Sequence, residues 1–249
     1  MNTSIDLNKY AILLDVDGTI LDFAPTPHEV RVPKALSNAL QRICERTSGA
    51  LALVSGRPLG DLDFIFTPLK LPAIGGHGAE IRPVAGGKPF EQRARTLDRE
   101  LRSRLSDVAK LNPSIIVEDK GYSLALHYRL AMDKEAEVRE RVVAICSARP
   151  SDIVEILPGK AVIEIKSAGF NKGTAVRELM TYQPFIDRCP IFIGDDTTDE
   201  AAFAVLPDFG GLGISVGRKV AGVAGRFQAP SDVRHWLERL ADSDVIVAS

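Results

Sequence analysis

Short apolar runs alternate with amphipathic stretches along the first part of the chain. Residues 10–14, 51–55 and 71–74 are apolar runs, and 33–46 places its apolar side chains at the spacing of one helical face. Runs that alternate with helices in this way are typical of parallel strands joined by helices. The pattern therefore predicts an α/β unit at the start of the chain.

The pattern changes at 82–92, a segment rich in proline and glycine that predicts a linker. Beyond it, helical stripes run through 97–108 and 133–148. Strand-like segments fall at 114–118, 122–128, 153–157 and 161–165. Two helices on an antiparallel sheet is the simplest interpretation, and it predicts an α+β domain over 89–167.

The α/β pattern resumes after the insert. A helix is expected from 171, a buried strand at 189–193, a short strand at 213–216 and a closing helix at 231–240. We therefore expect residues 1–88 and 168–249 to form one Rossmann-like core with a parallel sheet, interrupted by the inserted domain.

Composition narrows the class of protein. The 249 residues include 31 basic and 33 acidic ones, so neither a nucleic acid nor a membrane surface is indicated as a partner. The three cysteines, Cys44, Cys146 and Cys189, lie far apart without a CxxC spacing, which argues against a disulfide framework or a zinc site. The start of the chain has no signal-like segment, and we expect a cytoplasmic enzyme or binding protein.

Charged and hydroxyl side chains follow the predicted strands. In open parallel sheets, ligands bind beyond the carboxyl ends of the strands, so these side chains are expected to converge. They include several carboxylates, one hydroxyl and one ammonium, which a magnesium-dependent phosphoryl-transfer site requires. The candidates are Asp15, Asp17, Ser55, Arg57, Lys172, Asp195, Asp196 and Asp199.

The spacing of the first two aspartates suggests a division of roles. At a strand end the chain turns, so Asp15 and Asp17 can approach a phosphorus atom from different directions. Asp15 would be the nucleophile and, with Asp195, a Mg²⁺ ligand, and Asp17 would be the general acid and base. Thr19 can fix the direction of a carboxylate through a hydrogen bond.

The remaining candidates complete this hypothetical site. Ser55 and Lys172 would hold the phosphoryl oxygens, and Asp196 and Asp199 would support either the waters of the metal or Lys172. Taken singly, Ser55, Arg57, Lys172 and Asp199 are also compatible with ordinary turn or helix-start roles.

A calcium loop is a competing interpretation of the D-x-D spacing. It requires glycine at its sixth position and glutamate at its twelfth, where this chain has Ile20 and Thr26. That interpretation fails. A phosphate-accepting regulator without turnover is disfavoured by Asp17, because an acceptor needs no acid or base beside its nucleophile.

Four stretches resemble the motifs of the haloacid dehalogenase-like phosphatases: "DVDGT" (15–19), "VSGR" (54–57), Lys172 and "GDDTTDE" (194–200). The resemblance implies a Rossmann-like core with a mobile cap, Mg²⁺ and an aspartyl-phosphate intermediate. It also implies that Asp17 contacts the metal through its main-chain carbonyl, so that Asp15, Asp17 and Asp195 form the metal site.

Three further stretches resemble the trehalose-6-phosphate phosphatases within that superfamily: "GGHGAE" (75–80), "VEDKGYSLALHYR" (117–129) and "GFNKGTAV" (169–176). The resemblance implies that trehalose 6-phosphate is the substrate. It also implies that cap residues hold the sugar that carries no phosphate, namely Glu118, Lys120, Arg129 and Glu164.

Some of these expectations have open alternatives. Glu118 and Lys120 are two apart in a predicted strand and share a face, but an exposed ion pair is an equal interpretation without the resemblance. Arg57 and His77 are grouped with the substrate-binding residues, although His77 could equally be a turn residue. Another sugar phosphate, such as sucrose 6-phosphate, is the alternative substrate. A monomer is expected, and Asp22 has no assigned role.

Overall fold

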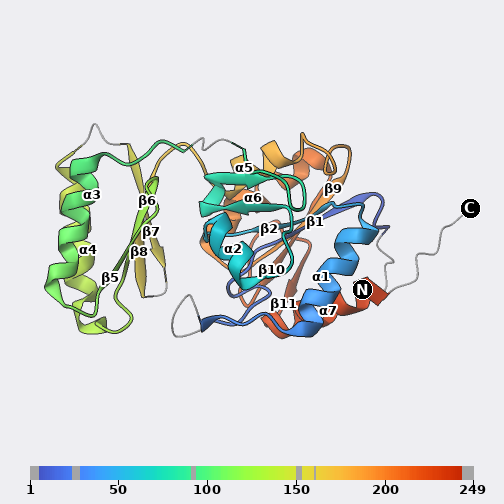
Figure 1. The fold of residues 1–249 in the computed structure, drawn as a ribbon, viewed down its shortest axis with the longest axis horizontal. Helices are drawn as coiled ribbons and strands as arrows, with labels where there is room; N and C mark the ends of the chain where they lie inside the picture. Colours follow the sequence, from blue (N-terminus) through green and yellow to red (C-terminus); the bar gives the residue numbers. More distant parts are fainter. Residues whose placement is uncertain (1–5, 24–28, 91–93, 150–152, 160, 243–249) are drawn as a thin grey trace, which may run out of the picture. The chain divides into compact units, whose positions relative to one another are not determined.

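The computed structural model describes residues 6–23, 29–90, 94–149, 153–159 and 161–242. It divides into two compact units (Figure 1). The first combines Met1–Glu91 with Asn171–Ser249, and the second is Gln92–Phe170. The first has a mostly parallel sheet and the second an antiparallel one, which confirms the predicted α/β core with an α+β insert.

The sheet of the first unit is built around β1. Ile12 of this strand pairs in register with Leu51 of β2 on one side and Ile191 of β9 on the other. All neighbours are parallel except β3 and β4. In spatial order the strands are β11 (Gly225–Phe227), β10 (Leu212–Val216), β9 (Cys189–Gly194), β1 (Tyr10–Leu14), β2 (Leu51–Val54), β3 (Ala73–Gly75) and β4 (Glu80–Arg82).

The strand order indicates where a ligand would bind. The chain builds outward from β1 to β3 and then returns to the other side of β1 with β9. At such a reversal the connections leave in opposite directions and open a crevice beyond the carboxyl ends of the strands. The strand order therefore predicts a ligand site at the carboxyl ends of β1 and β9.

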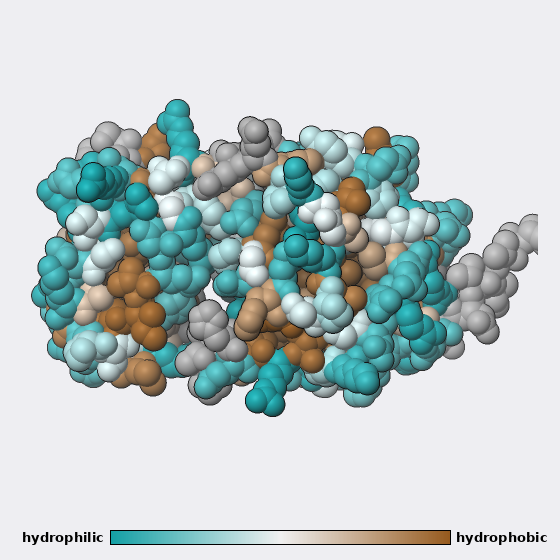
Figure 2. Space-filling view, viewed as in Figure 1, coloured by the Kyte–Doolittle hydropathy of each residue, from teal (hydrophilic) through white to brown (hydrophobic). Residues whose placement is uncertain are grey.

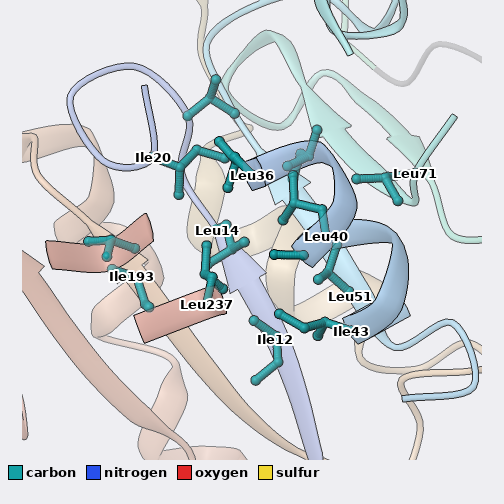
Figure 3. Close-up of a cluster of buried hydrophobic side chains, with 14 of the residues drawn as sticks. Ile12, Leu14, Ile20, Leu36, Leu40, Ile43, Leu51, Leu71, Ile193 and Leu237 are labelled. Atoms are coloured by element: carbon teal, nitrogen blue, oxygen red, sulfur yellow. The ribbon is translucent and has the colours of Figure 1, made fainter. Parts of the chain in front are cut away.

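Helices pack on both faces of this sheet because successive side chains of a buried strand point to opposite faces. Ile12 and Leu14 of β1 pack into a cluster with Leu40 and Leu237, which Figure 3 shows, and Leu13 belongs to the cluster on the other face. Burial of each such side chain contributes about 1.5–3 kcal/mol. The helices on the first face are α1 (Lys34–Arg46), α2 (Leu59–Ile65) and α7 (Pro230–Asp242), and those on the other are α5 (Lys172–Leu179) and α6 (Glu200–Phe203).

The second unit has one apolar and one polar sheet face. Leu124 and Ile165 point to the apolar face and pack with Leu101 of α3 and Val138 of α4, so both helices lie on that side (Figure 1). In spatial order its strands are β5 (Ile116–Asp119), β6 (Ser123–His127), β8 (Val162–Ser167) and β7 (Val154–Gly159), and its helices are α3 (Arg99–Ser106) and α4 (Glu135–Ser147).

Short 3₁₀ turns complete both units. They are η2 (Gly76–Gly78), η3 (Asp107–Leu111), η4 (Met132–Lys134), η5 (Thr197–Asp199) and η6 (Leu206–Phe209). Polar residues cover most of the face drawn in Figure 2, with apolar patches between them. Within the described part of the chain, every helix is too short or too polar to cross a membrane.

Candidate active site

Three candidate residues lie directly after the carboxyl ends of three neighbouring strands in the first unit. Asp15 follows β1, Ser55 follows β2 and Asp195 follows β9. Main-chain bonds extend the pairing to these positions: Asp15 N donates to Ile193 O at 2.9 Å and Ser55 N donates to Ile74 O at 2.8 Å. The structure therefore brings together side chains that are far apart in the sequence.

Three carboxylates form a compact cluster at this edge. One oxygen each from Asp15, Asp195 and Asp199 lies within 4.8 Å of the others. Thr19 Oγ1 donates to Asp195 Oδ1 at 3.0 Å and fixes that carboxylate. Gly18 has φ +86°, and a Cβ there would lie 2.3 Å from Asp195 Oδ2, so the turn requires glycine both for its backbone and for space.

Lys172 is the positive partner of this cluster. Its Nζ donates to Asp15 Oδ1 at 2.7 Å and to Asp199 Oδ1 at 2.6 Å, and all three side chains are buried. Lys172 is the first residue of α5, which Asn171 caps by accepting from Thr174 N at 2.9 Å. The cap therefore fixes the point from which the lysine reaches the carboxylates.

The charges in this cluster do not balance. Burial raises the pKa of Asp15 well above its usual range, and the carboxylates of Asp199 and Asp195 add to that effect while Lys172 opposes it. Burial and Asp199 likewise raise the pKa of Asp195. For Lys172, burial lowers the pKa, but Asp15 and Asp199 more than offset this and the net shift is upward.

Three carboxylates facing one ammonium fit a divalent cation. Hard carboxylate oxygens are the donors that Mg²⁺ and similar ions prefer, and a nearby cation favours the ionised form of each acid. Asp15 and Asp195 each offer an oxygen within 4.8 Å of the other, and Lys172 binds Asp15 and Asp199. The donor chemistry is therefore compatible with a divalent metal.

Asp17 has a different partner from Asp15. Its carboxylate accepts two bonds from Arg57, Nε to Oδ2 at 2.6 Å and Nη2 to Oδ1 at 2.7 Å. This is the two-pronged geometry that a guanidinium forms with a carboxylate. Within the described residues, the Asp17 side chain is not among the three clustered carboxylates. A metal contact through its main-chain carbonyl and a substrate contact by Arg57 stay predictions.

The loop that carries His77 supports the Ser55 loop. His77 N donates to Ser55 O at 3.0 Å, and Arg57 N donates to the buried Ser55 Oγ at 3.1 Å. The His77 ring lies against Gly56, where a Cβ would come within 2.4 Å of Nε2. Glu80, which the sequence did not single out, accepts from Leu59 N at 2.7 Å at the start of α2. His77 therefore supports the loop of Ser55 and Gly56. Its contact with substrate stays a prediction.

The loop after β9 is held from two sides. Asp196 Oδ1 accepts from Thr197 N at 2.6 Å, and Asp196 N donates to Asp199 Oδ2 at 2.9 Å. Arg218 donates to the main-chain oxygens of Asp195 and Asp196, both at 2.8 Å. Sequence reasoning missed Arg218, because no motif links it to this loop.

A second polar group lies within the second unit. Lys120 Nζ is 3.4 Å from Glu118 Oε1 and 3.5 Å from Glu164 Oε1, so three of the four expected sugar contacts share one sheet face. Arg129 is exposed in the turn after β6. Two residues without an assigned role join the group: His127 Nε2 lies 2.9 Å from Glu118 Oε2, and Ser123 Oγ donates to Glu164 Oε1 at 2.6 Å.

One residue left without a role has a structural partner. The carboxylate of Asp22 lies 3.1 Å from Arg234 on α7, and Arg234 also donates to Ile20 O at 3.1 Å. This contact ties the loop after β1 to the helix.

Comparison with known proteins gives a consistent family. The trehalose-phosphatase family model matches residues 13–233. The chain is 36% identical over 232 residues to the trehalose-6-phosphate phosphatase of Escherichia coli, covering 93% of this chain and 86% of that protein. It is 41% identical over 219 residues to a probable trehalose-phosphate phosphatase of Sinorhizobium fredii, covering 87% and 81%.

Solved structures agree on the fold. A trehalose-6-phosphate phosphatase related protein superposes with a TM-score of 0.75 at 26% identity, covering 93% of this chain and 96% of that one. The C-terminal domain of a trehalose-6-phosphate phosphatase from C. albicans gives a TM-score of 0.81 at 22% identity, covering 94% and 92%, and supports the fold alone.

Proposed function

Because this chain belongs to the trehalose-phosphatase family, a family of phosphomonoester hydrolases, we propose that it hydrolyses trehalose 6-phosphate to trehalose and phosphate with Mg²⁺, a step of trehalose biosynthesis. The observation that carries the proposal is the cluster that the buried Asp15, Lys172 and Asp199 form with the half-buried Asp195 beyond β1 and β9. This cluster has the donors for a cation and the ammonium for a phosphoryl oxygen.

The metal would be held by the carboxylates of Asp15 and Asp195 and the main-chain carbonyl of Asp17. When bound, Mg²⁺ supplies charge neutralisation for the phosphoryl group and for the acids around it. Ser55 and Lys172 would hold the phosphoryl oxygens at the carboxyl ends of the strands. These oxygens carry the negative charge that must be stabilised during transfer. Thr19, Asp196 and Asp199 keep the carboxylates and the lysine in place.

The reaction proceeds in two displacements at phosphorus. An Asp15 oxygen attacks the phosphorus, the bond from phosphorus to the sugar oxygen breaks, and Asp17 gives its proton to that oxygen. Asp17 then takes a proton from water, whose oxygen attacks the aspartyl-phosphate. The bond from phosphorus to Asp15 breaks and phosphate leaves. Because Asp17 carries the proton in the first step, the proposal requires its ion pair with Arg57 to loosen when substrate binds.

The second unit would select the sugar. Glu118, Lys120 and Glu164 offer acceptors and donors on one face, and such a set rejects analogues that lack the matching hydroxyl groups. Arg129 is proposed as a further contact, as are Arg57 and His77 in the first unit. Sucrose 6-phosphate is not favoured, because the family model and the relatives reported above are trehalose phosphatases. We expect a cytoplasmic monomer with no nucleic-acid or membrane partner.

Phosphate release by the purified chain tests the proposed substrate. Trehalose 6-phosphate, sucrose 6-phosphate, glucose 6-phosphate and an aryl phosphate are compared with Mg²⁺ and with a chelator. We expect the highest kcat/KM for trehalose 6-phosphate and loss of release with the chelator. Equal kcat/KM across the sugar phosphates would contradict the substrate assignment and leave only a phosphatase.

A further inference from the structure

The polar face of the second unit's sheet is organised around Ala125 on β6. This residue pairs in register with Glu118 on β5 and with Glu164 on β8. All three side chains therefore point to one face, with a methyl group between two carboxylates. The opposite face packs against α3 and α4 through Leu124 and its neighbours, so the polar face is not needed for that packing.

Two further residues of β6 share this face because they lie two positions on either side of Ala125. His127 reaches diagonally to Glu118, with Nε2 2.9 Å from Oε2. Ser123 reaches diagonally in the other direction and donates Oγ–H to Glu164 Oε1 at 2.6 Å. Diagonal neighbours in a sheet are within reach of such side chains. The central strand thus supplies one short hydrogen bond to the carboxylate on each side.

Lys120 joins the two carboxylates less tightly. Its Nζ lies 3.4 Å from Glu118 Oε1 and 3.5 Å from Glu164 Oε1, both longer than the bonds from β6. Lys120 therefore adds positive charge near both carboxylates, and the shorter contacts, from His127 to Glu118 and from Ser123 to Glu164, orient them. A carboxylate has about four lone-pair sites, so one short donor orients it without exhausting its capacity to accept.

The charge state of Glu118 suits an acceptor. Burial raises the pKa of Glu118, but the hydrogen bond from His127 and the charge of Lys120 outweigh burial and the net shift is downward. The side chain is 34% exposed, so solvent and ligands can reach it. An ionised, oriented and accessible carboxylate accepts hydrogen bonds from hydroxyl groups.

We propose that His127 and Ser123 are positioning residues that aim Glu118 and Glu164 at the hydroxyl groups of the sugar. The inference rests on the proposed function, since it assumes a sugar phosphate as substrate. Orienting both carboxylates before binding reduces the loss of side-chain freedom on binding and sharpens selection for hydroxyl geometry. Neither residue takes part in the reaction at phosphorus.

The test compares His127→Gln with His127→Asn. The amide nitrogen of glutamine reaches about as far as Nε2 of histidine, whereas asparagine is shorter and keeps polarity without the reach. We expect His127→Asn to raise KM for trehalose 6-phosphate about tenfold, the usual effect of losing a hydrogen bond to a charged group. His127→Gln should restore most of the lost affinity, and kcat and aryl phosphate cleavage should stay within about twofold. His235→Gln, an exposed histidine of α7, is the control for loss of an imidazole.

Double variants separate the two pairs. On a Glu118→Gln background, His127→Asn should add little to KM, while Ser123→Ala should still raise it, because each donor serves its own carboxylate. Thermal midpoints show whether a variant has weakened the fold instead. An unchanged KM in His127→Asn, no rescue by glutamine, or equal losses with aryl phosphate would overturn the inference. Failure of the wild-type chain on trehalose 6-phosphate would instead overturn the proposed function and this inference with it.

Discussion

Asp15 and Asp17 are two residues apart, yet their carboxylates have different partners. Asp15 is buried against Lys172 within the acidic cluster, and Asp17 is bound by Arg57. Gly18, directly after Asp17, turns the chain with φ +86°. The two acids thus occupy different environments, as the proposed roles of nucleophile and proton carrier require.

Asp17→Asn tests this division. Asparagine keeps the size of the side chain and the main-chain carbonyl but carries no transferable proton, so turnover of trehalose 6-phosphate should fall by about 10²–10⁴-fold. Stabilisation of the protein by Mg²⁺, followed as a thermal shift, should persist. Asp22→Asn is the matched control, since Asp22 lies in the same loop and binds Arg234 at 3.1 Å. Normal turnover in Asp17→Asn would sink the acid and base assignment.

At the residue scale, the sequence indicated which side chains belong to the candidate site more readily than which hydrogen-bond partner each one has. Aspartates after strands indicated a phosphoryl-transfer site because few structural roles need two carboxylates so close together. The pairing of Asp17 with Arg57 depends on how the loops after β1 and β2 turn, which no spacing reveals. His127 could have been suspected, since period-two alternation places it with Ser123 and Ala125 on one face, but its partner Glu118 follows only from strand register.

The N-terminal cap of α5 positions the ammonium group of the proposed active site. Asn171 Oδ1 accepts from Thr174 N at 2.9 Å, and Asn171 N donates to Thr174 Oγ1 at 3.0 Å, a reciprocal capping box. The next residue, Lys172, carries the ammonium of the cluster. Position 173 requires glycine because α5 and α6 approach closely there. A Cβ at this position would lie 2.1 Å from Ala201 O.

Asn171→Ala should lower the free energy of unfolding by about 1 kcal/mol, the usual cost of losing an N-cap. We expect kcat to fall by more than this loss of stability explains. Lys172 is the first residue of α5, and without the cap the helix end that positions it frays. Asn171→Ser keeps a capping oxygen and is the control. Chemical denaturation gives the stability and phosphate release gives kcat. If both variants retained full kcat, the link between the cap and Lys172 would be wrong.

Elements with many periodic residues were predicted well from the sequence. The helix expected at 33–46 is α1 (Lys34–Arg46), and the strand expected at 10–14 is β1. The pattern gave no indication of β4, β11, α2 or α6, which are short. A strand as short as Glu80–Arg82 shows no full alternation, and its pairing with β3 comes from the turn at Gly76–Gly78. Local pattern cannot carry that information.

At the scale of the whole molecule, the candidate chemistry divides between the two units. The residues proposed for phosphoryl transfer belong to the unit of Met1–Glu91 and Asn171–Ser249, and Glu118, Lys120 and Glu164 belong to Gln92–Phe170. The sequence placed the boundaries at 88/89 and 167/168, three residues before those of the structure. That the second unit acts as a mobile cap over the substrate stays a prediction.

The central claim is that Asp15 becomes phosphorylated during turnover of trehalose 6-phosphate. Rapid acid quench of the wild-type enzyme during steady turnover with Mg²⁺, followed by peptide mass analysis, tests it directly. The account predicts one phosphoryl group on the peptide that contains Asp15, and its absence when Mg²⁺ is chelated. Full turnover without a modified Asp15, or with the phosphoryl group on another residue, would contradict the account.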